Sequence, residues 1–541
     1  MAERMNVVDK LKMSYRFKTR DHVGAFVLLT VIAHASTAYG VETRDTRPNI
    51  LFAIADDWSF GHAGAYGCQW ISTPTFDRVA KQGLLFRRAY TPNAKCAPSR
   101  ACILTGRNSW QLKDACNHVC YFPSEFKGFC EALAENGYQV GYTGKGWGPG
   151  VAKAANSQLR QLTGRPFNAR RMKPPAQAMS NLDYAANFVD FLKESTGDGP
   201  WCFWYGTMEP HRGFEYGVGV ANGRSLTDIK RVPGYWPDNE RIRNDMLDYG
   251  FEVEYFDQHL GRILQALEDA GELANTLVIV TSDHGMPFPR CKGQAYEASN
   301  HVPLAIMWGD QILHPGREVN EYVSFIDFAS TILEVAQLDA EQVGMQPSPG
   351  KSLNDLFRNE PTTRDFVVLG KERHDIGRPH DWGYPIRGII HEDYLYLRNH
   401  RPERWPAGNP RTGYLNCDGS PTKTWILDAR RNGSDPSHWQ LCFGKRPAEE
   451  LYFIKDDPDC LSNLASDASY ATRKEALADR LNAILVEQRD PRTLGQPHYF
   501  DLIRFSNVNH RDFYQRYLAG ERIRAGWVNP GDFEKEEIDA P

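Results

Sequence analysis

The chain has 541 residues, of which 41% are hydrophobic and 24% are charged, and this composition is typical of globular proteins. Its 63 basic residues minus its 68 acidic residues give a formal net charge of −5, so no general basic surface is expected and nucleic acid is excluded as a partner. A chain of this length commonly holds more than one domain. We expect two domains behind a removable N-terminus.

The N-terminus, residues 1–40, has the order of a secretory signal. Basic residues between Lys10 and Arg20 precede an apolar run at residues 23–33, and small residues follow. The apolar run is shorter than the ~20 residues that span a bilayer. We therefore expect a signal peptide, with an uncleaved anchor as the alternative, and no other stable membrane partner. The protein would be secreted or periplasmic, where its eleven cysteines could form disulfides.

Short apolar runs predict buried strands at residues 48–55, 201–205 and 276–281, and helical patterns lie at 182–194 and 249–270. Strands that alternate with helices predict an α/β fold, in which helices cover both faces of a mainly parallel sheet. Ligands bind such sheets beyond the carboxyl ends of the strands. The three strand runs are each followed closely by acidic or histidine residues, so we expect the functional site at that edge.

The pattern changes after about residue 380. Residues 386–398 alternate around a His-Glu-Asp turn and predict a hairpin, and a strand, a turn and a helix are expected between 450 and 489. Residues 399–445 are rich in Gly, Pro, Asn and Arg and predict a long loop. The expected division is therefore a catalytic domain at 46–380, a smaller α+β, antiparallel-sheet subdomain at 381–495 and a tail at 496–541.

A cation site is predicted at the strand ends. Asp56 and Asp57 follow the first strand run, and Asp283 and His284 follow a later one. Three carboxylates and one nitrogen suit a divalent cation; oxygen ligands favour Ca²⁺ or Mg²⁺, although a histidine ligand is less usual for Ca²⁺. Taken alone, the Asp pair is a weak signal, because Asp also caps helices.

The most specific motif is CAPSRACILTGR, which begins at Cys96. It resembles the type I sulfatase signature C-x-P-S-R-x-x-x-L-T-G at every specified position. In that family a formylglycine-generating enzyme oxidises the cysteine to formylglycine, whose hydrate is the nucleophile. The resemblance implies this conversion at Cys96, and a Ca²⁺ ion, with Mg²⁺ less favoured, held by residue 96 and the four strand-end residues. The alternative is a buried thiol before a helix.

Further segments match the same family over roughly residues 47–465. YTGK ends at Lys145, EPHR contains His211, and a family-like K-x-x-x-Y-E segment begins at Lys292. The resemblance implies that both lysines and Arg100 contact the sulfate and that His211 or Lys292 is the general acid. It also implies an alkaline-phosphatase-like fold. Each basic residue could instead be an ordinary surface charge.

Within the family, residues 209–212, 285–289 and 383–387 look most like heparan N-sulfatase (sulfamidase). Charged residues precede the last of these segments, and Glu372 and His374 among them are candidates for binding a sugar. The alternative for these residues is a solvated, charged turn.

One position departs from the family. Sulfatases commonly carry a histidine two residues after the first lysine, and here Trp147 occupies that place. An indole cannot accept a proton, so the base that regenerates the aldehyde is left open, with His62 and His301 as substitutes. Trp147 itself is expected to bind substrate by stacking on a sugar ring.

These observations predict a secreted sulfatase that hydrolyses sulfate esters or sulfamates on a glycan such as a heparan-type polysaccharide. One alternative is a phosphatase or phosphodiesterase of the same superfamily, since phosphate and sulfate have similar geometry. Another is an inactive homologue that only binds sulfated glycans, an idea that the missing histidine at Trp147 favours.

Overall fold

The computed structural model of the chain describes residues 46–195 and 199–538, so the expected signal at residues 1–40 lies outside it. Its largest sheet has short and long strands drawn from most of the N-terminal two thirds of the chain. They are β1 (Asn49–Ala55), β2 (Leu84–Phe86), β5 (Gln139–Gly144), β7 (Arg165–Pro166), β8 (Trp201–Gly206), β9 (Thr276–Ser282), β10 (Leu304–Met307) and β11 (Arg317–Val319).

Within the described residues these strands form an eight-stranded sheet in the order β11-β2-β10-β9-β1-β8-β5-β7. The central strand β1 pairs in parallel with β8 and β9, and β5 pairs in parallel with β8 and β7. Only β10 runs antiparallel to its neighbours, β9 and β2. The predicted mainly parallel sheet and its three predicted strands are confirmed.

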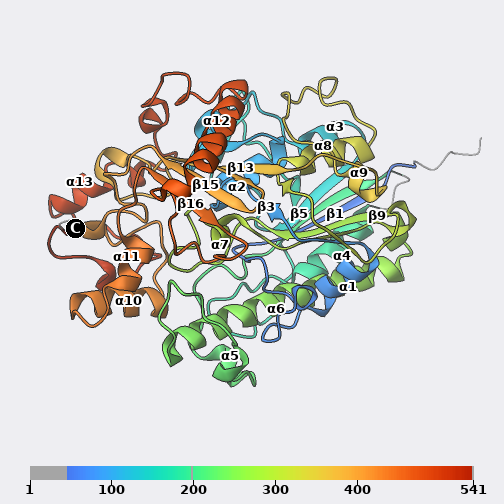
Figure 1. Cartoon of the computed structure of the whole chain (residues 1–541). Coiled ribbons are helices and arrows are strands. Elements are labelled where there is room, and N and C mark those ends of the chain that lie inside the picture. Colours follow the sequence, from blue (N-terminus) through green and yellow to red (C-terminus); the bar gives the residue numbers. More distant parts are fainter. Residues whose placement is uncertain (1–45, 196–198, 539–541) are drawn as a thin grey trace, which may run out of the picture. The chain divides into compact units, whose positions relative to one another are not determined.

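Helices cover both faces of this sheet, as Figure 1 shows. Along β1, Leu51 and Ala53 belong to one buried cluster, whereas Ile50 and Phe52 belong to a second. The first cluster includes residues of α1 (Pro74–Gln82), α4 (Tyr184–Glu194) and α6 (Glu240–Asp269). The second includes residues of α2 (Cys96–Thr105), α3 (Phe129–Glu135) and α8 (Asp327–Val335).

Helix α6 is longer than the pattern at residues 249–270 predicts. It begins at Glu240 because the side chain of Asn239 accepts hydrogen bonds from the amides of Arg241 and Ile242, which satisfies donors that the first helical turn leaves free. The buried apolar residues of the helix begin at Ile242. Polar residues interrupt the apolar pattern directly after it, so the sequence pattern did not reveal the first turns of the helix.

Because His259 of α6 is buried, we expect the protein to lose folding stability in acid. The side chain is 2% exposed and lies between Tyr184 and Tyr255. Burial, aided by Arg262, lowers the pKa of His259 to about 4. The folded-state pKa is below the unfolded value, so this stability is complete above pH 6.5 and is lost as the pH falls towards 4. The loss is about 3 kcal/mol.

The measurement is chemical denaturation between pH 7 and 4. His259→Phe, which keeps a ring at this place, should flatten the pH dependence, whereas the exposed control variant His498→Phe should keep it. An equal slope in all three proteins would show that other groups cause the acid loss.

A second sheet is antiparallel and has the order β13-β14-β15-β16. Its strands are β13 (Phe366–Lys371), β14 (Ile386–His391), β15 (Tyr394–Asn399) and β16 (Glu449–Phe453). Helix α12 (Ala471–Glu487) packs on it through three leucines at helical spacing, Leu477, Leu481 and Leu485 (Figure 1). The predicted hairpin is confirmed. The sheet begins before residue 381, and the divisions at residues 380 and 495 stay predictions.

The expected long loop at residues 399–445 is wrong in part, because it contains α10 (Pro421–Arg431) and α11 (Ser437–Phe443). Ser420 caps α10 through the amide of Lys423 and Pro421 takes the first helical position, where proline is well tolerated. The remaining elements are short: β3 (Ala89–Tyr90), β4 (Cys120–Phe122), β6 (Gly150–Ala152), β12 (Val323–Ser324), α5 (Val218–Ala221), α7 (Glu297–Asn300), α9 (Asn354–Phe357) and α13 (Phe513–Leu518).

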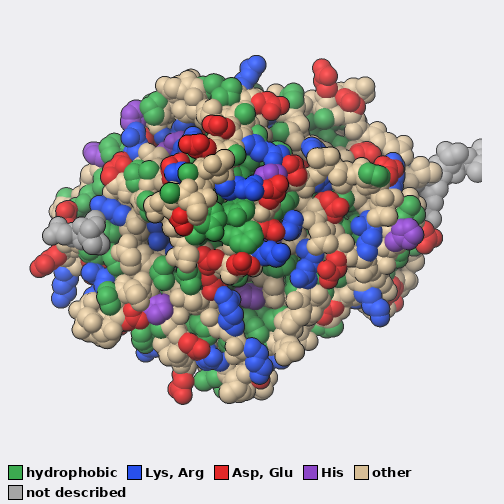
Figure 2. Space-filling model, in the orientation of Figure 1, with side chains coloured by type: hydrophobic (Ala, Val, Ile, Leu, Met, Phe, Trp, Pro, Cys, Tyr) green, Lys and Arg blue, Asp and Glu red, His purple; other side chains and the backbone are tan. Residues whose placement is uncertain are grey.

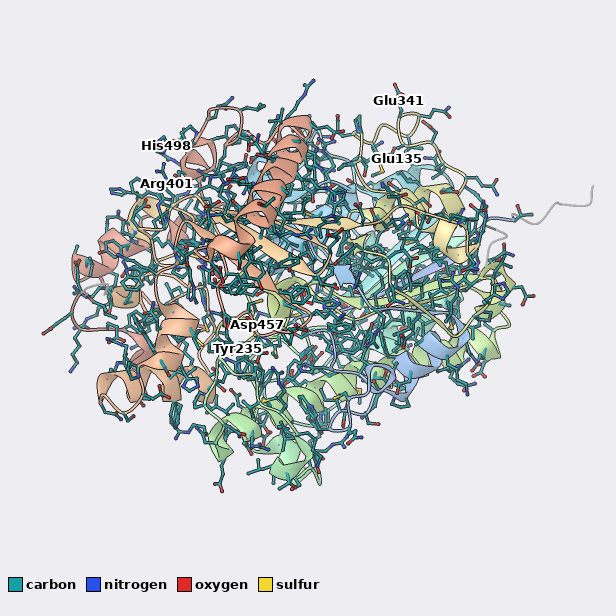
Figure 3. The ribbon with its side chains drawn as sticks, in the orientation of Figure 1. Glu135, Tyr235, Glu341, Arg401, Asp457 and His498 are labelled. Carbon is teal, nitrogen blue, oxygen red and sulfur yellow. The ribbon has the colours of Figure 1, made fainter. Side chains whose placement is uncertain are left out.

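Residues 496–538 are fastened to the rest of the chain although their sequence has little periodicity. Figure 3 shows His498 beside Arg401, and Nη2 of the arginine lies 3.4 Å from Nδ1 of the histidine. Farther along, Phe505 and Phe513 are buried in one cluster with Ile376. Residues 496–538 therefore pack against the rest of the folded chain.

Three general properties bear on function. On the face that Figure 2 shows, basic and acidic side chains are interspersed, as expected from the balanced composition. All eleven cysteines have free thiols, so none of the disulfides that an oxidising compartment permits is present. In the described part of the chain, every helix is too short or too polar to cross a membrane.

Candidate active site

The site lies at the carboxyl ends of the central parallel strands, where the sequence predicts it. Asp56 and Asp57 follow β1, Asp283 and His284 follow β9, and Lys145 follows β5. Cys96 is the first residue of α2, so its side chain meets these strand ends at the N-terminus of a helix. A helix N-terminus favours negative charge, because its free amides point outward.

Four of the predicted metal ligands converge. Ligand atoms of Asp56, Asp57, Cys96 and His284 all lie within 4.8 Å of one another, and all four residues are buried. Oδ1 of Asp56 is buried without a hydrogen-bond partner among the described residues, and Oδ1 of Asp57 lies 3.0 Å from Nε2 of His284, another member of the group. A buried, unpaired carboxylate oxygen is costly unless a cation compensates it. The residues present therefore fit a divalent cation.

Asp283 is adjacent to this group, with its Oδ1 3.7 Å from Nε2 of His284, and its expected role as a ligand stays a prediction. Its Oδ2 accepts from Nε of Arg100 at 2.9 Å, and its Oδ1 accepts from the amide of Asp57 at 3.1 Å. Burial raises the pKa of Asp283 to about 7, with His284 acting in the opposite direction. Through these two contacts the Asp283 carboxylate holds the side chain of Arg100 and the backbone of Asp57 in place.

His284 is aimed at the converging ligands. Its Nδ1 is 3.0 Å from the carbonyl oxygen of Gly285 and donates to it, so Nε2 faces Asp57 at 3.0 Å and the sulfur of Cys96 at 3.4 Å. Burial alone lowers the pKa of His284, but Asp283 and Asp57 raise it to about 9. A bound cation would replace this proton at Nε2.

Two lysines neutralise the aspartates beside Cys96. Nζ of Lys145 lies 2.5 Å from Asp56, and Nζ of Lys292 lies 2.7 Å from Asp57 and 3.0 Å from Asp418. Burial and Asp56 raise the pKa of the Cys96 thiol, but both lysines, with His118 nearby, hold it well below its usual range. The position of residue 96 thus stabilises negative charge.

Arg100 is fully buried beneath the site. Besides its pair with Asp283, its guanidinium donates to the carbonyl oxygens of Lys145 and Gly146 at 2.9 and 3.0 Å. It therefore holds the lysine segment against α2, and its charge lies 3.6 Å from Asp56. The structure brings it together with the other predicted catalytic residues.

His211 lies on the opposite side of the ligand group. Its Nδ1 is 2.6 Å from the carbonyl oxygen of Arg212 and donates to it, and Arg212 is anchored by Asp245 at 2.7 Å. Ligand atoms of Asp57, His211 and Asp418 lie within 4.8 Å of one another. The free Nε2 of His211 is therefore available to a molecule in the site.

A cavity of about 310 Å³ opens beside Cys96. It combines predicted residues with others that the sequence did not single out. Its lining residues are Lys95, Cys96, His118, Val119, Pro149, His211, Lys292, Asp375, Asp418, Asn507, His510 and Trp527.

His118 is the main residue that sequence reasoning missed. Its Nδ1 lies 3.0 Å from Asp375, whose other oxygen pairs with Nζ of Lys95 at 2.6 Å. Burial raises the pKa of Asp375, but Lys95 and His118 hold it well below its usual range, so it is a carboxylate. Nε2 of His118 is buried, lacks a partner among the described residues and lies in the wall of the Cys96 cavity.

The two histidines that the sequence offered as substitutes lie elsewhere. Nδ1 of His62 lies 3.2 Å from the hydroxyl of Tyr249. His301 uses both ring nitrogens, for Glu297 at 2.6 Å and the carbonyl of Arg87 at 2.9 Å. Neither residue lines the cavity. Among the histidines that line the cavity, only His118 pairs its other ring nitrogen with a carboxylate, that of Asp375, and no motif in the sequence marks it.

Trp147 is half-buried and is not among the residues that line the cavity, so its expected role as a sugar-stacking wall stays a prediction without support from this cavity. Its indole Nε1 donates to the carbonyl oxygen of Ala97 at 3.0 Å, and its ring packs edge-on against Phe122. The large ring fills the space between α2 and β4. It supports the helical turn that carries Cys96.

The expected sugar contacts Glu372 and His374 are buried and do not line the cavity. Glu372 is 1% exposed and pairs with Arg387 at 2.8 Å and Arg492 at 2.7 Å. Nε2 of His374 lies 2.8 Å from Asn93. The Glu372 carboxylate turns into the protein because a buried charge needs partners, and burial lowers the pKa of His374 well below its usual value, so that residue is neutral. Of this segment, Asp375 reaches the cavity.

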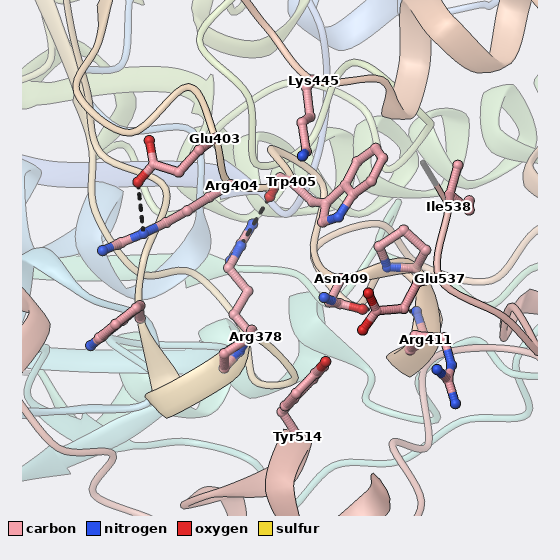
Figure 4. Close-up of a pocket in the computed structure, with 13 residues that line it drawn as sticks. Arg378, Glu403, Arg404, Trp405, Asn409, Arg411, Lys445, Tyr514, Glu537 and Ile538 are labelled. Atoms are coloured by element: carbon pink, nitrogen blue, oxygen red, sulfur yellow. Dashed lines mark hydrogen bonds and ion pairs between the residues drawn. The ribbon is translucent and has the colours of Figure 1, made fainter. Parts of the chain in front are cut away.

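A second cavity, of about 340 Å³, lies beyond the same segment and contains no predicted site residue (Figure 4). Arg378 donates to the carbonyl oxygen of Trp405 at 3.0 Å there, and Nζ of Lys445 lies 5.0 Å from the Trp405 ring. The guanidinium of Arg404 lies 4.7 Å from the ring of Trp382. Its cations are engaged with aromatic rings and carbonyls, so the reactive groups are concentrated in the Cys96 cavity.

Comparisons with known proteins agree with this site. The human N-sulphoglucosamine sulphohydrolase is 28% identical over 82% of this chain and 91% of its own length. A solved structure described as a complex with its substrate D-glucosamine-2-N,6-O-disulfate is 21% identical, with a TM-score of 0.58 over 82% of this chain and 98% of that one.

A phosphonate monoester hydrolase of Agrobacterium radiobacter has the same fold, with 19% identity and a TM-score of 0.56 over 82% of this chain and 97% of its own. The sequence model of the family described as Sulfatase matches residues 48–338, which is more than half of the 541 residues. The chain belongs to the Sulfatase family.

Proposed function

We propose that the protein hydrolyses sulfate esters or sulfamates on a sulfated sugar or glycan. The observation that carries the proposal is the placement of Cys96, within the complete sulfatase signature, between a buried ligand group for a cation and two lysines. The names of its relatives support a sulfated glucosamine as the sugar, as in heparan-type chains.

A more detailed proposal names the nucleophile and the cation that act at this site. Formylglycine at position 96, made by a formylglycine-generating enzyme, would supply a nucleophilic oxygen, and Ca²⁺ would polarise the sulfate. Asp56 and Asp57 supply the hard oxygen ligands that both Ca²⁺ and Mg²⁺ take, and Ca²⁺ accepts an irregular ligand group more readily than Mg²⁺, which demands a near-ideal octahedron. His284 would complete the ligand group.

The chain's own residues then bind and orient the sulfate. Lys145 and Lys292 face the place of residue 96 and neutralise charge on the sulfate oxygens, which grows as the bond to the leaving group breaks. The N-terminus of α2 adds its positive end. Arg100 holds these groups in position from below.

Two histidines flank the reaction and serve opposite proton transfers. His211, with a proton on both ring nitrogens, would donate the Nε2 proton to the leaving oxygen or nitrogen, while its Nδ1–H stays bonded to the backbone carbonyl of Arg212. His118 would accept a proton at Nε2 from the group at position 96. Asp375 fixes its tautomer and stabilises the resulting charge. The absent histidine at Trp147 therefore does not imply an inactive protein.

The experiment that tests the proposal compares sulfated with phosphorylated substrates, because the two groups have similar geometry. Protein from a host with a formylglycine-generating enzyme should release sulfate from N-sulfoglucosamine and 4-nitrocatechol sulfate far faster than phosphate from 4-nitrophenyl phosphate. The peptide that contains Cys96 should be lighter by about 18 Da. Preferential phosphate release would favour the phosphatase alternative, and binding without turnover would favour the inactive homologue.

Replacing His118 should reduce turnover. His118→Ala is expected to lower kcat by 10²- to 10⁴-fold, roughly the contribution of a general base, with a smaller change in KM. His62→Gln is the matched control, because His62 does not line the cavity. In unconverted protein, His118→Ala should also slow alkylation of the Cys96 thiol. Wild-type kcat in His118→Ala would assign the proton transfer to another group.

We also propose that the protein is exported. The basic, apolar and small order of residues 1–40 supports this, and so does a glycan substrate. Expression in a Gram-negative host, followed by fractionation and measurement of the N-terminal mass, tests it. Mature protein found only in the cytoplasm would contradict export.

A further inference from the structure

The C-terminal tail contributes to the catalytic cavity, although the family match ends at residue 338. Three of the twelve lining residues, Asn507, His510 and Trp527, come from it. The other lining residues include Lys95, Lys292, Asp375 and Asp418, so the cavity has a charged side and a tail side. The charged side suits the sulfate, and the tail side must meet the rest of the substrate.

The tail is held firmly at this place. Nε1 of Trp527 donates to the carbonyl oxygen of Leu415 at 2.9 Å, and the carbonyl oxygen of Trp527 accepts from the amide of Gly419 at 2.8 Å. Gly419 directly follows Asp418, which pairs with Lys292. The position of Trp527 is therefore fixed relative to the sulfate side of the cavity.

A second attachment fixes the same tail beside the histidine. The amide of Ser506 donates to the carbonyl oxygen of Val119 at 3.0 Å, next to His118. The buried cluster of Phe505, Phe513 and Ile376 lies behind it. A wall that is anchored at both ends can recognise a ligand with little loss of conformational entropy.

The chemistry of the wall suits a sugar ring. The indole N–H of Trp527 is engaged with the backbone, so the half-buried ring offers its apolar face, and the C–H face of a pyranose stacks on such a surface. Nδ1 of His510 is buried and has no partner among the described residues, and its ring lies 6.2 Å from that of Trp527. Asn507 is exposed, and its Oδ1 accepts from the amide of Asn509 at 3.0 Å, which leaves its side-chain N–H groups for sugar hydroxyls.

The size of the cavity limits what it holds. Pockets for drug-sized ligands have roughly 300–1,000 Å³, and this one has about 310 Å³. It therefore has room for one sulfated sugar unit, with the chain leaving through the mouth.

We propose that the wall formed by Asn507, His510 and Trp527 is the sugar-recognition subsite of this enzyme, and that it restricts hydrolysis to a terminal sugar unit. The inference rests on the proposed sulfatase activity. On this proposal the three tail residues determine which sugar binds. The Cys96 signature and the metal-ligand group contact only the sulfate.

The test separates sugar binding from sulfate binding. Trp527→Ala should raise KM for N-sulfoglucosamine at least tenfold and leave the inhibition constant of inorganic sulfate within about twofold of wild type. Trp527→Phe should restore most of the affinity. Trp382→Ala, in the second cavity of Figure 4, is the matched control and should behave as wild type. Calorimetry with the inactive Cys96→Ala variant should show the same loss of sugar affinity.

An unchanged KM in Trp527→Ala, or an equal loss of sugar and inorganic sulfate binding, would overturn the subsite. His510→Ala and Asn507→Ala give the same test if Trp527→Ala does not fold. A tetrasaccharide with a sulfamate on each glucosamine should lose only the terminal one, and release of internal sulfamates would overturn the restriction to chain ends. Failure to release sulfate from any substrate would instead reject the proposed function.

Discussion

Cys96→Ala abolishes sulfate release and leaves the fold intact. Cys96 is the cysteine at the signature position that the proposed mechanism converts to formylglycine, so on that mechanism the variant lacks the nucleophile and not merely a binding contact. Loss of a nucleophile from a site whose residues act together lowers kcat by on the order of 10⁴-fold or more. Sulfate release at substrate saturation, compared with wild type, measures the effect.

The structure supplies a matched control on the same helix. Cys102 is also buried in α2, but it belongs to the apolar cluster of that face and does not line the cavity. Cys102→Ala should keep activity at some cost in stability, because it leaves a small cavity. Cys96→Ser should fail in a host that oxidises only cysteine. Wild-type turnover in Cys96→Ala, at equal circular dichroism, would show that the nucleophile lies elsewhere.

The sheet was predictable because its strands carry a strong local signal. The runs that became β1, β8 and β9 are continuously apolar, since both faces of a central parallel strand are covered. The helices at residues 421–431 and 437–443 were missed because their caps, Ser420 and Pro436, resemble loop residues. In a segment rich in Gly, Pro, Asn and Arg, a helical periodicity of so few turns is too weak a signal to identify a helix.

The cation group and the lysines were predictable for a different reason. Asp56, Asp57, His284, Lys145 and Lys292 follow strands or lie in motifs, so topology or resemblance alone places them together. At three other expected positions, Trp147, Glu372 and His374, the side chain contacts its neighbours within the protein and does not line the cavity. A motif position does not tell whether a side chain faces the cavity or a neighbouring helix.

The unpredicted half of the cavity comes from contacts between distant segments. His118 and Asp375 are 257 residues apart, yet the amide of His118 donates to the carbonyl oxygen of Arg373 at 3.1 Å, which places the pair together. Trp527 reaches the same cavity from a tail without periodicity. Such groups are set by tertiary packing, and no local pattern encodes them.

Removal of the divalent cation should abolish activity, and Ca²⁺ should restore it better than Mg²⁺. The physical reason is that ligand atoms of Asp56, Asp57, Cys96 and His284 converge in a buried site, where Oδ1 of Asp56 accepts no hydrogen bond from the described residues. The same cation should stabilise the fold, since a ligand at 100 times its Kd adds about 2.7 kcal/mol to the free energy of unfolding. Chelation followed by readdition, with thermal unfolding alongside turnover, measures both effects.

Asp57→Asn tests the ligand group directly. The amide keeps the size of the side chain but removes one negative charge, and it leaves Lys292 paired with Asp418 alone. We expect at least a tenfold weaker Ca²⁺ affinity by calorimetry and a smaller rise of Tm with Ca²⁺. The control Asp190→Asn alters only an ion pair with the exposed Arg170 and should bind Ca²⁺ as wild type does. If protein shown by elemental analysis to lack metal kept full turnover, the aspartates would have a purely structural role, and the lysines alone would have to hold the sulfate.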